Sequence, residues 1–239
     1  MSDELNIARP TIKEIILVGI LSTFGLTDCS VYTHQTVDIP LINEKNEVRA
    51  DAGISIKEFL YGTISYGLTD KIALQTFYNT GATGRFFFQN AVGYFRDLGN
   101  RNIMEIYSGF AFGHTDFGNH DVPTRLKGPY QLYFTQFNFG KIDCQFANAD
   151  FGFGIKAGFL HSNLENLNFF THYSPYTGPY EPLVVNSFLL EPNAFLRIGG
   201  EKLKFSLKLG SCWHYQFINK DKNLPVDKLN IGLGLNYRF

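Results

Sequence analysis

The chain has 239 residues and a formal net charge of −1, and it combines 24 Phe, 13 Tyr and 23 Gly with only 18% charged residues. The near-zero net charge argues against nucleic-acid binding, which requires a basic face, and the length allows one large β domain or two ordinary domains. Aromatic residues and glycines favour a tightly packed sheet, because aromatic side chains suit a pleated surface and glycine permits close turns.

The longest apolar run lies near the amino terminus, at residues 15–26. It is shorter than the roughly 20 residues that a membrane-spanning helix needs, and Arg9 and Lys13 precede it. A short apolar core behind basic residues is typical of a secretory signal peptide. The sequence therefore predicts a signal peptide over residues 1–28.

The residues that follow the apolar run, Leu26-Thr27-Asp28-Cys29, resemble a lipobox. This resemblance implies cleavage before Cys29 and acylation of its thiol as a lipid anchor. Asp28 stands where a small residue is usual, so ordinary signal cleavage nearby, with Cys29 unmodified, is the alternative. Residues 29–47 show no clear period, and we expect an extended periplasmic tether; the sequence leaves open whether it tucks under or into the rest of the protein.

Alternation between apolar and polar residues recurs throughout residues 48–239. A strand turns successive side chains to opposite faces, so this alternation predicts strands with one apolar face. The predicted strands are residues 48–57, 60–68, 71–79, 85–96, 102–113, 129–141, 147–160, 183–198, 202–215 and 228–239. The fourth and sixth are aromatic on both faces, which leaves their register open.

The connections between these strands alternate in length. Counted back from the carboxyl terminus, the connections at one end are all short, and the three long loops, at residues 114–128, 161–182 and 216–227, all fall at the other end. Short periplasmic turns and long external loops are typical of outer-membrane barrels. We therefore predict an all-β fold in which residues 48–239 form a transmembrane antiparallel up-and-down β-barrel of about ten strands. Its carboxyl terminus is periplasmic and its long loops are extracellular.

Several short sequences resemble those of a known class of envelope proteins. They are CS at 29–30, VDIPL at 37–41, ADFGFG at 149–154, LEPN at 190–193 and NYRF at 236–239. On these, residues 29–239 resemble a small outer-membrane β-barrel lipoprotein of the Bacteroidota type. The resemblance implies a place in the outer membrane of a Gram-negative bacterium, contact with its lipid, and assembly by the barrel-assembly machinery. Tyr237 and Phe239 would form the carboxyl-terminal assembly signal.

The first predicted strand begins on the periplasmic side. We therefore expect a lipid on Cys29 to lie in the inner leaflet of the outer membrane. The two other cysteines, Cys144 and Cys212, map near opposite ends of the barrel, and we expect both to be free.

Charged residues recur on the polar, inward faces of the predicted strands. They are Arg49, Asp51, Lys57, Glu105, Asp150, Lys156, Glu191, Arg197, Lys204, Lys208 and Arg238. Charges inside a barrel are costly unless they are paired or hydrated, so we expect ladders across neighbouring strands, with Glu191 and Arg197 meeting Lys204 and Lys208. Either these pairs close a filled lumen, or the basic excess lines a narrow, slightly anion-favouring pore or a small-ligand pocket.

One long external loop is rich in aromatic residues. Its aromatic residues are Phe169, Phe170, Tyr173, Tyr176 and Tyr180. They offer stacking surfaces for a partner or a glycan, and the alternatives are a lid over the barrel mouth or part of an interfacial aromatic belt.

Two further groups of residues have a chemical interpretation. His114, Asp116, His120 and Asp121 share one external loop, and imidazole with carboxylate can hold zinc, but spacing within a loop is a weak signal. His161-Ser162-Asn163 is similar to the His-x-Ser-Asn signature of outer-membrane lipid A deacylases. Those enzymes need the base and the nucleophile two residues apart on one strand face, whereas here they are adjacent.

The sequence thus predicts no enzyme, no catalytic residue, no metal and no cofactor. The favoured function is a structural or accessory role in a larger cell-envelope complex. The alternative is a small porin-like channel or small-ligand transporter, and a remote alternative is a lipid A deacylase-like enzyme.

Overall fold

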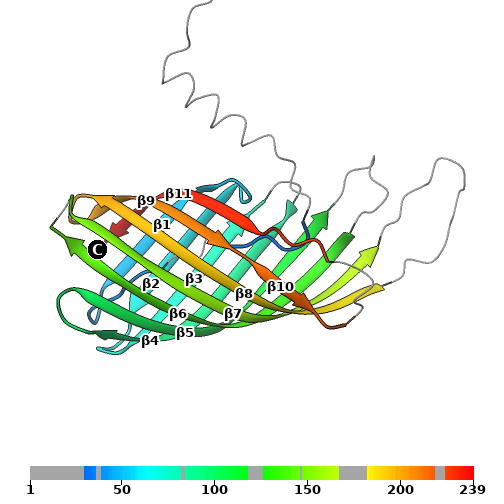
Figure 1. Cartoon of the computed structure of the whole chain (residues 1–239), viewed down its shortest axis with the longest axis horizontal. Coiled ribbons are helices and arrows are strands. Elements are labelled where there is room, and N and C mark those ends of the chain that lie inside the picture. Colours follow the sequence, from blue (N-terminus) through cyan, green and yellow to red (C-terminus); the bar gives the residue numbers. More distant parts are fainter. Residues whose placement is uncertain are drawn as a thin grey trace, which may run out of the picture.

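The computed structural model of the chain describes residues 30–35, 39–81, 84–117, 126–145, 147–166, 182–218 and 224–239. Within these ranges the regular structure consists of β-strands, drawn in Figure 1. The strands are β1 (Val48–Ser55), β2 (Leu60–Gly67), β3 (Ile72–Thr80), β4 (Phe86–Asp97), β5 (Asn102–Phe117), β6 (Leu126–Cys144), β7 (Ala149–Asn166), β8 (Pro182–Gly199), β9 (Leu203–Ser211), β10 (Trp213–Gln216) and β11 (Leu229–Arg238).

The strands form a closed antiparallel barrel. Each strand from β1 to β8 pairs with the next in sequence, β8 pairs with β9, β9 with β11, and β11 with β1. The last pairing closes the ring, with Ala50 opposite Tyr237 and Ile54 opposite Leu233. Closure pairs the strands of the ring on both sides, except for the short β10, which pairs only with β8.

β9 and β10 are two parts of one strand, so the barrel has ten strands as predicted. β9 pairs with β8 from Lys204 to Gly210, and β10 continues along β8 with Trp213 opposite Leu190. The interruption lies at Cys212, whose backbone N–H donates to the carbonyl of Lys228 at 3.0 Å.

The two ends of the barrel differ as the sequence predicts. One end, here the turn end, carries the connections at residues 68–71, 98–101, 145–148 and 200–202 together with the carboxyl terminus. The other, here the loop end, carries the connections at 118–125, 167–181 and 217–228. β5, β6 and β7 extend several residues farther toward the loop end than predicted, because their alternation continues into the predicted loops.

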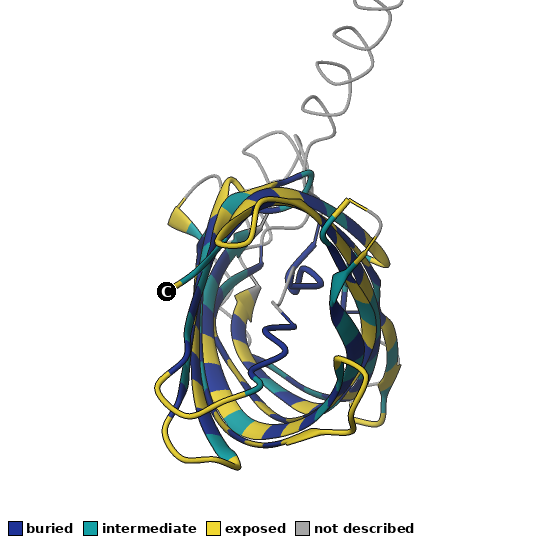
Figure 2. Ribbon diagram, turned by 90° about the vertical axis from the view of Figure 1, so that its left-hand side faces the viewer, coloured by how far each residue is buried: buried dark blue, intermediate teal, exposed yellow. Residues whose placement is uncertain are grey.

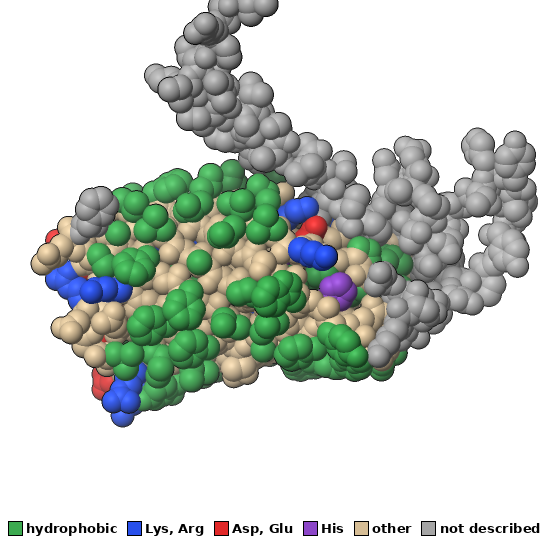
Figure 3. Space-filling model, in the orientation of Figure 1, with side chains coloured by type: hydrophobic (Ala, Val, Ile, Leu, Met, Phe, Trp, Pro, Cys, Tyr) green, Lys and Arg blue, Asp and Glu red, His purple; other side chains and the backbone are tan. Residues whose placement is uncertain are grey.

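The outer face of the barrel is apolar over the middle of the strands (Figure 3). Along β9, Leu203, Phe205, Leu207 and Leu209 are exposed, and the residues between them are buried. Burial also shows which side chains of β4 and β6 face inward, which the sequence left undecided. In β4 the side chains of Phe87 and Phe95 face inward, and in β6 those of Tyr130 and Phe134 do.

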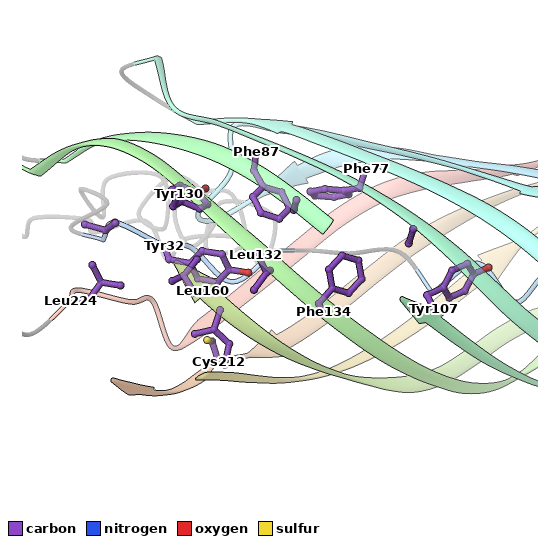
Figure 4. Packing of buried hydrophobic residues seen from close by; sticks show 14 of the residues in the cluster. Tyr32, Phe77, Phe87, Tyr107, Tyr130, Leu132, Phe134, Leu160, Cys212 and Leu224 are labelled. Carbon is purple, nitrogen blue, oxygen red and sulfur yellow. The ribbon is translucent and has the colours of Figure 1, made fainter. Parts of the chain in front are cut away.

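The interior is packed, and part of it comes from outside the barrel strands. Residues 30–35 and 39–42 are buried, and they lie inside the ring in the view along the barrel (Figure 2). Tyr32 packs edge-on against Phe87 and Tyr130, with ring centroids 6.3 and 5.8 Å apart (Figure 4). The predicted tether is therefore an internal segment of the barrel.

Candidate functional site

The candidate site is the lumen with the segment that fills it. We call the described residues 30–35 and 39–47 the plug. The plug enters the lumen at the loop end, where the backbone N–H of Val31 donates to the carbonyl of Pro225 at 2.9 Å. It leaves at the turn end, where the N–H of Asn46 donates to the carbonyl of Gly67 at 2.7 Å, and it continues into β1. The plug thus runs the length of the barrel.

His34 makes the central contact between the plug and the wall. Its Nδ1 lies 3.1 Å from Glu191 Oε1, and its Nε2 lies 2.9 Å from Asn193 Oδ1. Its carbonyl accepts a hydrogen bond from Asn230 Nδ2 at 2.7 Å. Lys156 Nζ lies 3.0 Å from the other oxygen of Glu191. One buried carboxylate therefore joins the plug to β7 and β8.

Two charged wall residues bind the backbone of the plug nearer the turn end. Arg197 Nη2 donates to the carbonyl of Ile39 at 2.6 Å, and Glu105 Oε1 accepts from the N–H of Ile42 at 2.8 Å. Asn138 Nδ2 donates to the second oxygen of Glu105 at 3.0 Å. The plug has no regular secondary structure to satisfy its own backbone, so wall side chains supply these partners.

Gly210 in β9 leaves room for the His34 ring of the plug. A Cβ atom there would lie 1.9 Å from His34 Nε2, which no real side chain could tolerate. Gly154 in β7 makes similar room, because a Cβ atom would lie 3.0 Å from Ile39 Cδ1. Inward glycines of the wall thus provide the space that plug side chains occupy, and the two surfaces are complementary.

An ion-pair network closes the turn end around the last plug residues. Glu47 Oε1 accepts from Arg49 Nε at 2.7 Å and lies 2.9 Å from Arg238 Nε. Lys204 Nζ lies 2.5 Å from Asp150 Oδ1 and 2.8 Å from an oxygen of Asp143. Separately, Lys208 pairs with Asp51 at 2.5 Å.

The structure buries nine of the eleven predicted inward charges in the interior of the barrel. These nine are Arg49, Asp51, Glu105, Asp150, Lys156, Glu191, Arg197, Lys204 and Lys208. Lys57 and Arg238 are partly exposed near the two ends, with side-chain exposures of 16% and 25%.

The expected pairing of Glu191 and Arg197 with Lys204 and Lys208 is wrong. Glu191 binds Lys156 and His34, whereas the two β9 lysines reach acids on β1, β6 and β7. The long lysine side chains pass over one intervening strand inside the lumen, because β8 lies between β9 and β7, and β11 lies between β9 and β1.

Sequence reasoning missed three acids that balance the inward charges: Glu47, Asp143 and Asp227. Glu47 lies between Arg49 and Arg238, Asp143 pairs with Lys204, and Asp227 lies 3.1 Å from Lys57 Nζ. The signal for them was the basic excess itself, since buried cations need acidic partners. That excess is neutralised within the interior and does not leave a basic lining.

A small cavity lies beside the loop-end part of the plug. Its volume is about 20 Å³, and it is lined by polar residues of plug and wall, including Gln35, Glu58, Asn79 and Arg85. A cavity of this size holds about one water molecule. This cavity itself is too small for a solute larger than water.

The other predicted sites have these positions. Ser162 faces the interior and is fully buried, whereas His161 lies on the outer side with its Nδ1 2.6 Å from Asn186 Oδ1. Asp116 lies 3.5 Å from Lys127 Nζ across the β5–β6 pair. Cys144 and Cys212 are both free.

Several predicted residues lie outside the described part of the chain. They are the signal peptide 1–28, Cys29, His120, Asp121, and the loop residues Phe169, Phe170, Tyr173, Tyr176 and Tyr180. Within the described ranges, no group of three or more potential metal-ligating side chains occurs. Those ranges also contain no helix both long and apolar enough to cross a membrane.

The carboxyl terminus lies on the outside of the turn end. Phe239 is 71% exposed, and its ring packs against that of Tyr237 with centroids 4.6 Å apart. The backbone N–H of Phe239 donates to the carbonyl of Val48 at 3.0 Å, which ties the chain end to the start of β1.

A scan against protein-family models and a search of curated proteins both found no match to this chain.

Proposed function

We propose that the protein is an outer-membrane β-barrel whose outer face contacts lipid. The outer side chains at the middle of the described strands are mainly apolar, for example Ile64, Val92 and Phe205, each more than half exposed. A soluble monomer rarely exposes a contiguous apolar surface this large. The exposed charges gather toward the barrel ends, as Arg96 and Asp97 do at the turn end (Figure 3).

Polar groups within this apolar belt satisfy one another. Thr76 Oγ1 donates to Asn90 Oδ1 at 2.8 Å, and Ser108 Oγ lies 3.0 Å from Thr135 Oγ1. Each pair is formed by direct cross-strand neighbours. Hydroxyls that face water need no such partner, whereas in hydrocarbon an unpaired one is costly. The pairing supports a lipid-facing surface.

Trp213 provides a direct test of the proposed lipid contact. It is the only tryptophan of the chain, and its side chain is 62% exposed on the outer face. In vesicles whose acyl chains carry bromine, we expect strong quenching of Trp213 fluorescence. Emission that stays unquenched, at a wavelength typical of tryptophan in water, would contradict the membrane proposal.

Within that membrane setting, we assign the barrel a structural or accessory role in a larger envelope complex. The observation that carries this assignment is the buried plug, which is bound to the wall at His34, Ile39 and Ile42 and occupies the lumen. A barrel filled in this way offers its loops, rather than its lumen, for function. The transport alternative requires the plug to leave its site.

A variant shortened at the aromatic loop tests the accessory role. Residues 166–181 can be replaced by a two-residue turn, because Glu165 and Pro182 are already cross-strand partners at the ends of β7 and β8. We expect the wild-type protein to elute from detergent-solubilised membranes in a complex larger than one barrel, and the shortened variant to elute alone. Wild-type protein that elutes as a single barrel and transports a solute would instead favour the transporter.

A further inference from the structure

A cavity of about 520 Å³ lies at the turn end, between the β4–β5 connection and the end of β6. Its volume is within the range of about 300–1,000 Å³ that is usual for small-molecule sites. The cavity beside the plug, by contrast, holds about one water molecule. The turn-end cavity is therefore large enough for part of an organic ligand. It is lined by Asn100, Arg101, Lys141, Asp143, Cys144 and Gln145.

Two of the lining residues, Arg101 and Lys141, are cations on neighbouring strands. Arg101 Nη1 donates to the backbone carbonyl of Asp143, and the carbonyl of Arg101 accepts from the N–H of Ile142 at 3.0 Å. Lys141 is the cross-strand partner of Asn102, the residue after Arg101. These bonds hold Arg101 against the end of β6, beside Lys141.

Asp143, the acidic residue of the lining, does not neutralise these two cations. Its Oδ1 lies 2.8 Å from Lys204 Nζ, and its Oδ2 lies 3.3 Å from Arg238 Nη1. Within the part of the chain that the structure describes, neither Arg101 nor Lys141 forms an ion pair with a carboxylate. The cavity therefore offers a net positive charge, which suits an anionic ligand.

The backbone at Arg101 is strained. Its φ is +66°, in the left-handed region that glycine or asparagine adopts more readily than arginine. Residues held in such conformations cluster at ligand-binding sites. A role for the guanidinium group in the cavity would account for an arginine at this position.

The cavity borders the apolar belt of the outer face. Lys141 lies on the outer side of β6, two residues beyond Phe139. Its cross-strand partner on β7 is Phe151, which is 50% exposed. The next outward pair is Phe139 with Phe153, whose ring centroids are 5.8 Å apart. Cationic groups at the edge of an apolar surface match an anionic lipid, whose phosphate adjoins its acyl chains.

We propose that this cavity binds the head group of an anionic phospholipid. Its phosphate lies between Arg101 and Lys141, and its acyl chains run along Phe151 and Phe153. The inference rests on the proposed lipid contact of the outer face, and it names the class of lipid that the turn end selects.

Retention of lipid by the purified full-length protein tests the inference. The protein is reconstituted in phosphatidylcholine vesicles with or without phosphatidylglycerol, and is then extracted in mild detergent. Native mass spectrometry counts the phospholipids that stay bound. The test variant is Arg101→Gln with Lys141→Gln. The matched control, Lys71→Gln with Lys202→Gln, removes the same charge from exposed turn-end side chains that do not line the cavity.

We expect the wild-type protein to retain phosphatidylglycerol and to lose phosphatidylcholine. Each basic side chain beside an anionic head group contributes about fivefold to binding, so the test variant should bind phosphatidylglycerol about 25-fold more weakly. The control variant should bind it as the wild type does. Equal losses in the two variants would show a general attraction between charges, and would overturn the inference.

Cys144 gives a second measurement, on the wild-type protein alone. Its thiol lines the cavity, whereas Cys212 is only 1% exposed. We expect N-ethylmaleimide to label Cys144 more slowly in vesicles that contain phosphatidylglycerol than in phosphatidylcholine alone, and inorganic phosphate to give no protection. Equal labelling rates in the two kinds of vesicle would contradict the inference. Equal protection by inorganic phosphate would make soluble phosphate the ligand, and would also overturn it.

Quenching of Trp213 by brominated acyl chains, measured on the same vesicles, separates this inference from the proposed function. If Trp213 is quenched but phosphatidylglycerol is neither retained nor protective, the inference alone falls. If Trp213 stays unquenched, the membrane proposal fails, and the inference fails with it.

Discussion

Arg49 and Arg238 lie directly opposite each other across the β1–β11 pair that closes the barrel. Like charges in this position destabilise a sheet, and Glu47 Oε1 lies within 2.9 Å of both guanidinium groups. Glu47 is the last residue of the plug before β1. The plug therefore contributes a carboxylate that offsets the repulsion between these two arginines, together with Asp150 beside Arg49 and Asp143 beside Arg238.

Replacing Glu47 by glutamine should destabilise the closed barrel. The substitution keeps the size of the side chain and removes the charge that the two arginines share. Breaking a buried ion pair by removing one partner costs about 3–5 kcal/mol, which urea unfolding in lipid vesicles would measure. Glu44→Gln is the matched control, because Glu44 is 68% exposed and lies 3.7 Å from the same Arg238. Glu44→Gln should lower the free energy of unfolding by about 0–1 kcal/mol.

Replacing Gly210 by valine should displace the plug without unfolding the wall. The new side chain would occupy the position of the His34 ring, and β-branched residues are otherwise favourable in strands. We expect faster swelling of vesicles that contain the variant in sugar solutions. Gly62→Val is the control, since a Cβ atom at Gly62 meets only the carbonyl of Asp51, at 3.9 Å. A folded Gly210→Val barrel with wild-type swelling rates would count against the assigned plug position.

The Lys156–Glu191 pair should show strong coupling. Glu191→Leu alone leaves Lys156 buried without its carboxylate, and we expect a loss of about 3–5 kcal/mol in the free energy of unfolding. The double variant Lys156→Met with Glu191→Leu should be much closer to wild type, because apolar replacement of a whole buried pair is often tolerated. A double-mutant cycle measures the difference. Simply additive losses would show that the two side chains do not interact.

A charge placed in the apolar belt should oppose membrane insertion according to its depth. Val92 lies at the middle of β4, and we expect Val92→Lys to cost about 2–4 kcal/mol in insertion free energy. Asp97 lies at the turn end of the same strand, and Asp97→Lys should cost about 0–1 kcal/mol in insertion free energy. Folding titrations in lipid vesicles compare the two. Equal losses would argue that both positions face water.

The barrel could be predicted from the sequence because its strands have a simple period. In β9, leucine and phenylalanine alternate with lysine, serine and glycine, and this pattern specifies both the strand and its inner face. In β4 the pattern fails, since Phe86 and Phe87 point to opposite faces. Phe87 points inward, where its ring packs against Tyr32 of the plug. No local period in the sequence reveals this contact.

The plug could not be predicted because it has no period. Residues such as Tyr32, His34 and Leu41 are enclosed on all sides, so apolar and polar residues follow one another without alternation. The indirect signals were the inward glycines, such as Gly210, and the excess of inward cations. Both show that the wall needs further partners, but neither shows which segment supplies them.

Current through the purified protein in a planar lipid bilayer tests the central claim most directly, that the amino-terminal segment closes the lumen. The wild-type barrel should insert and conduct no more than the bilayer alone, under conditions in which Gly210→Val gives measurable current. A steady current that rises linearly with voltage through the wild-type barrel would contradict it.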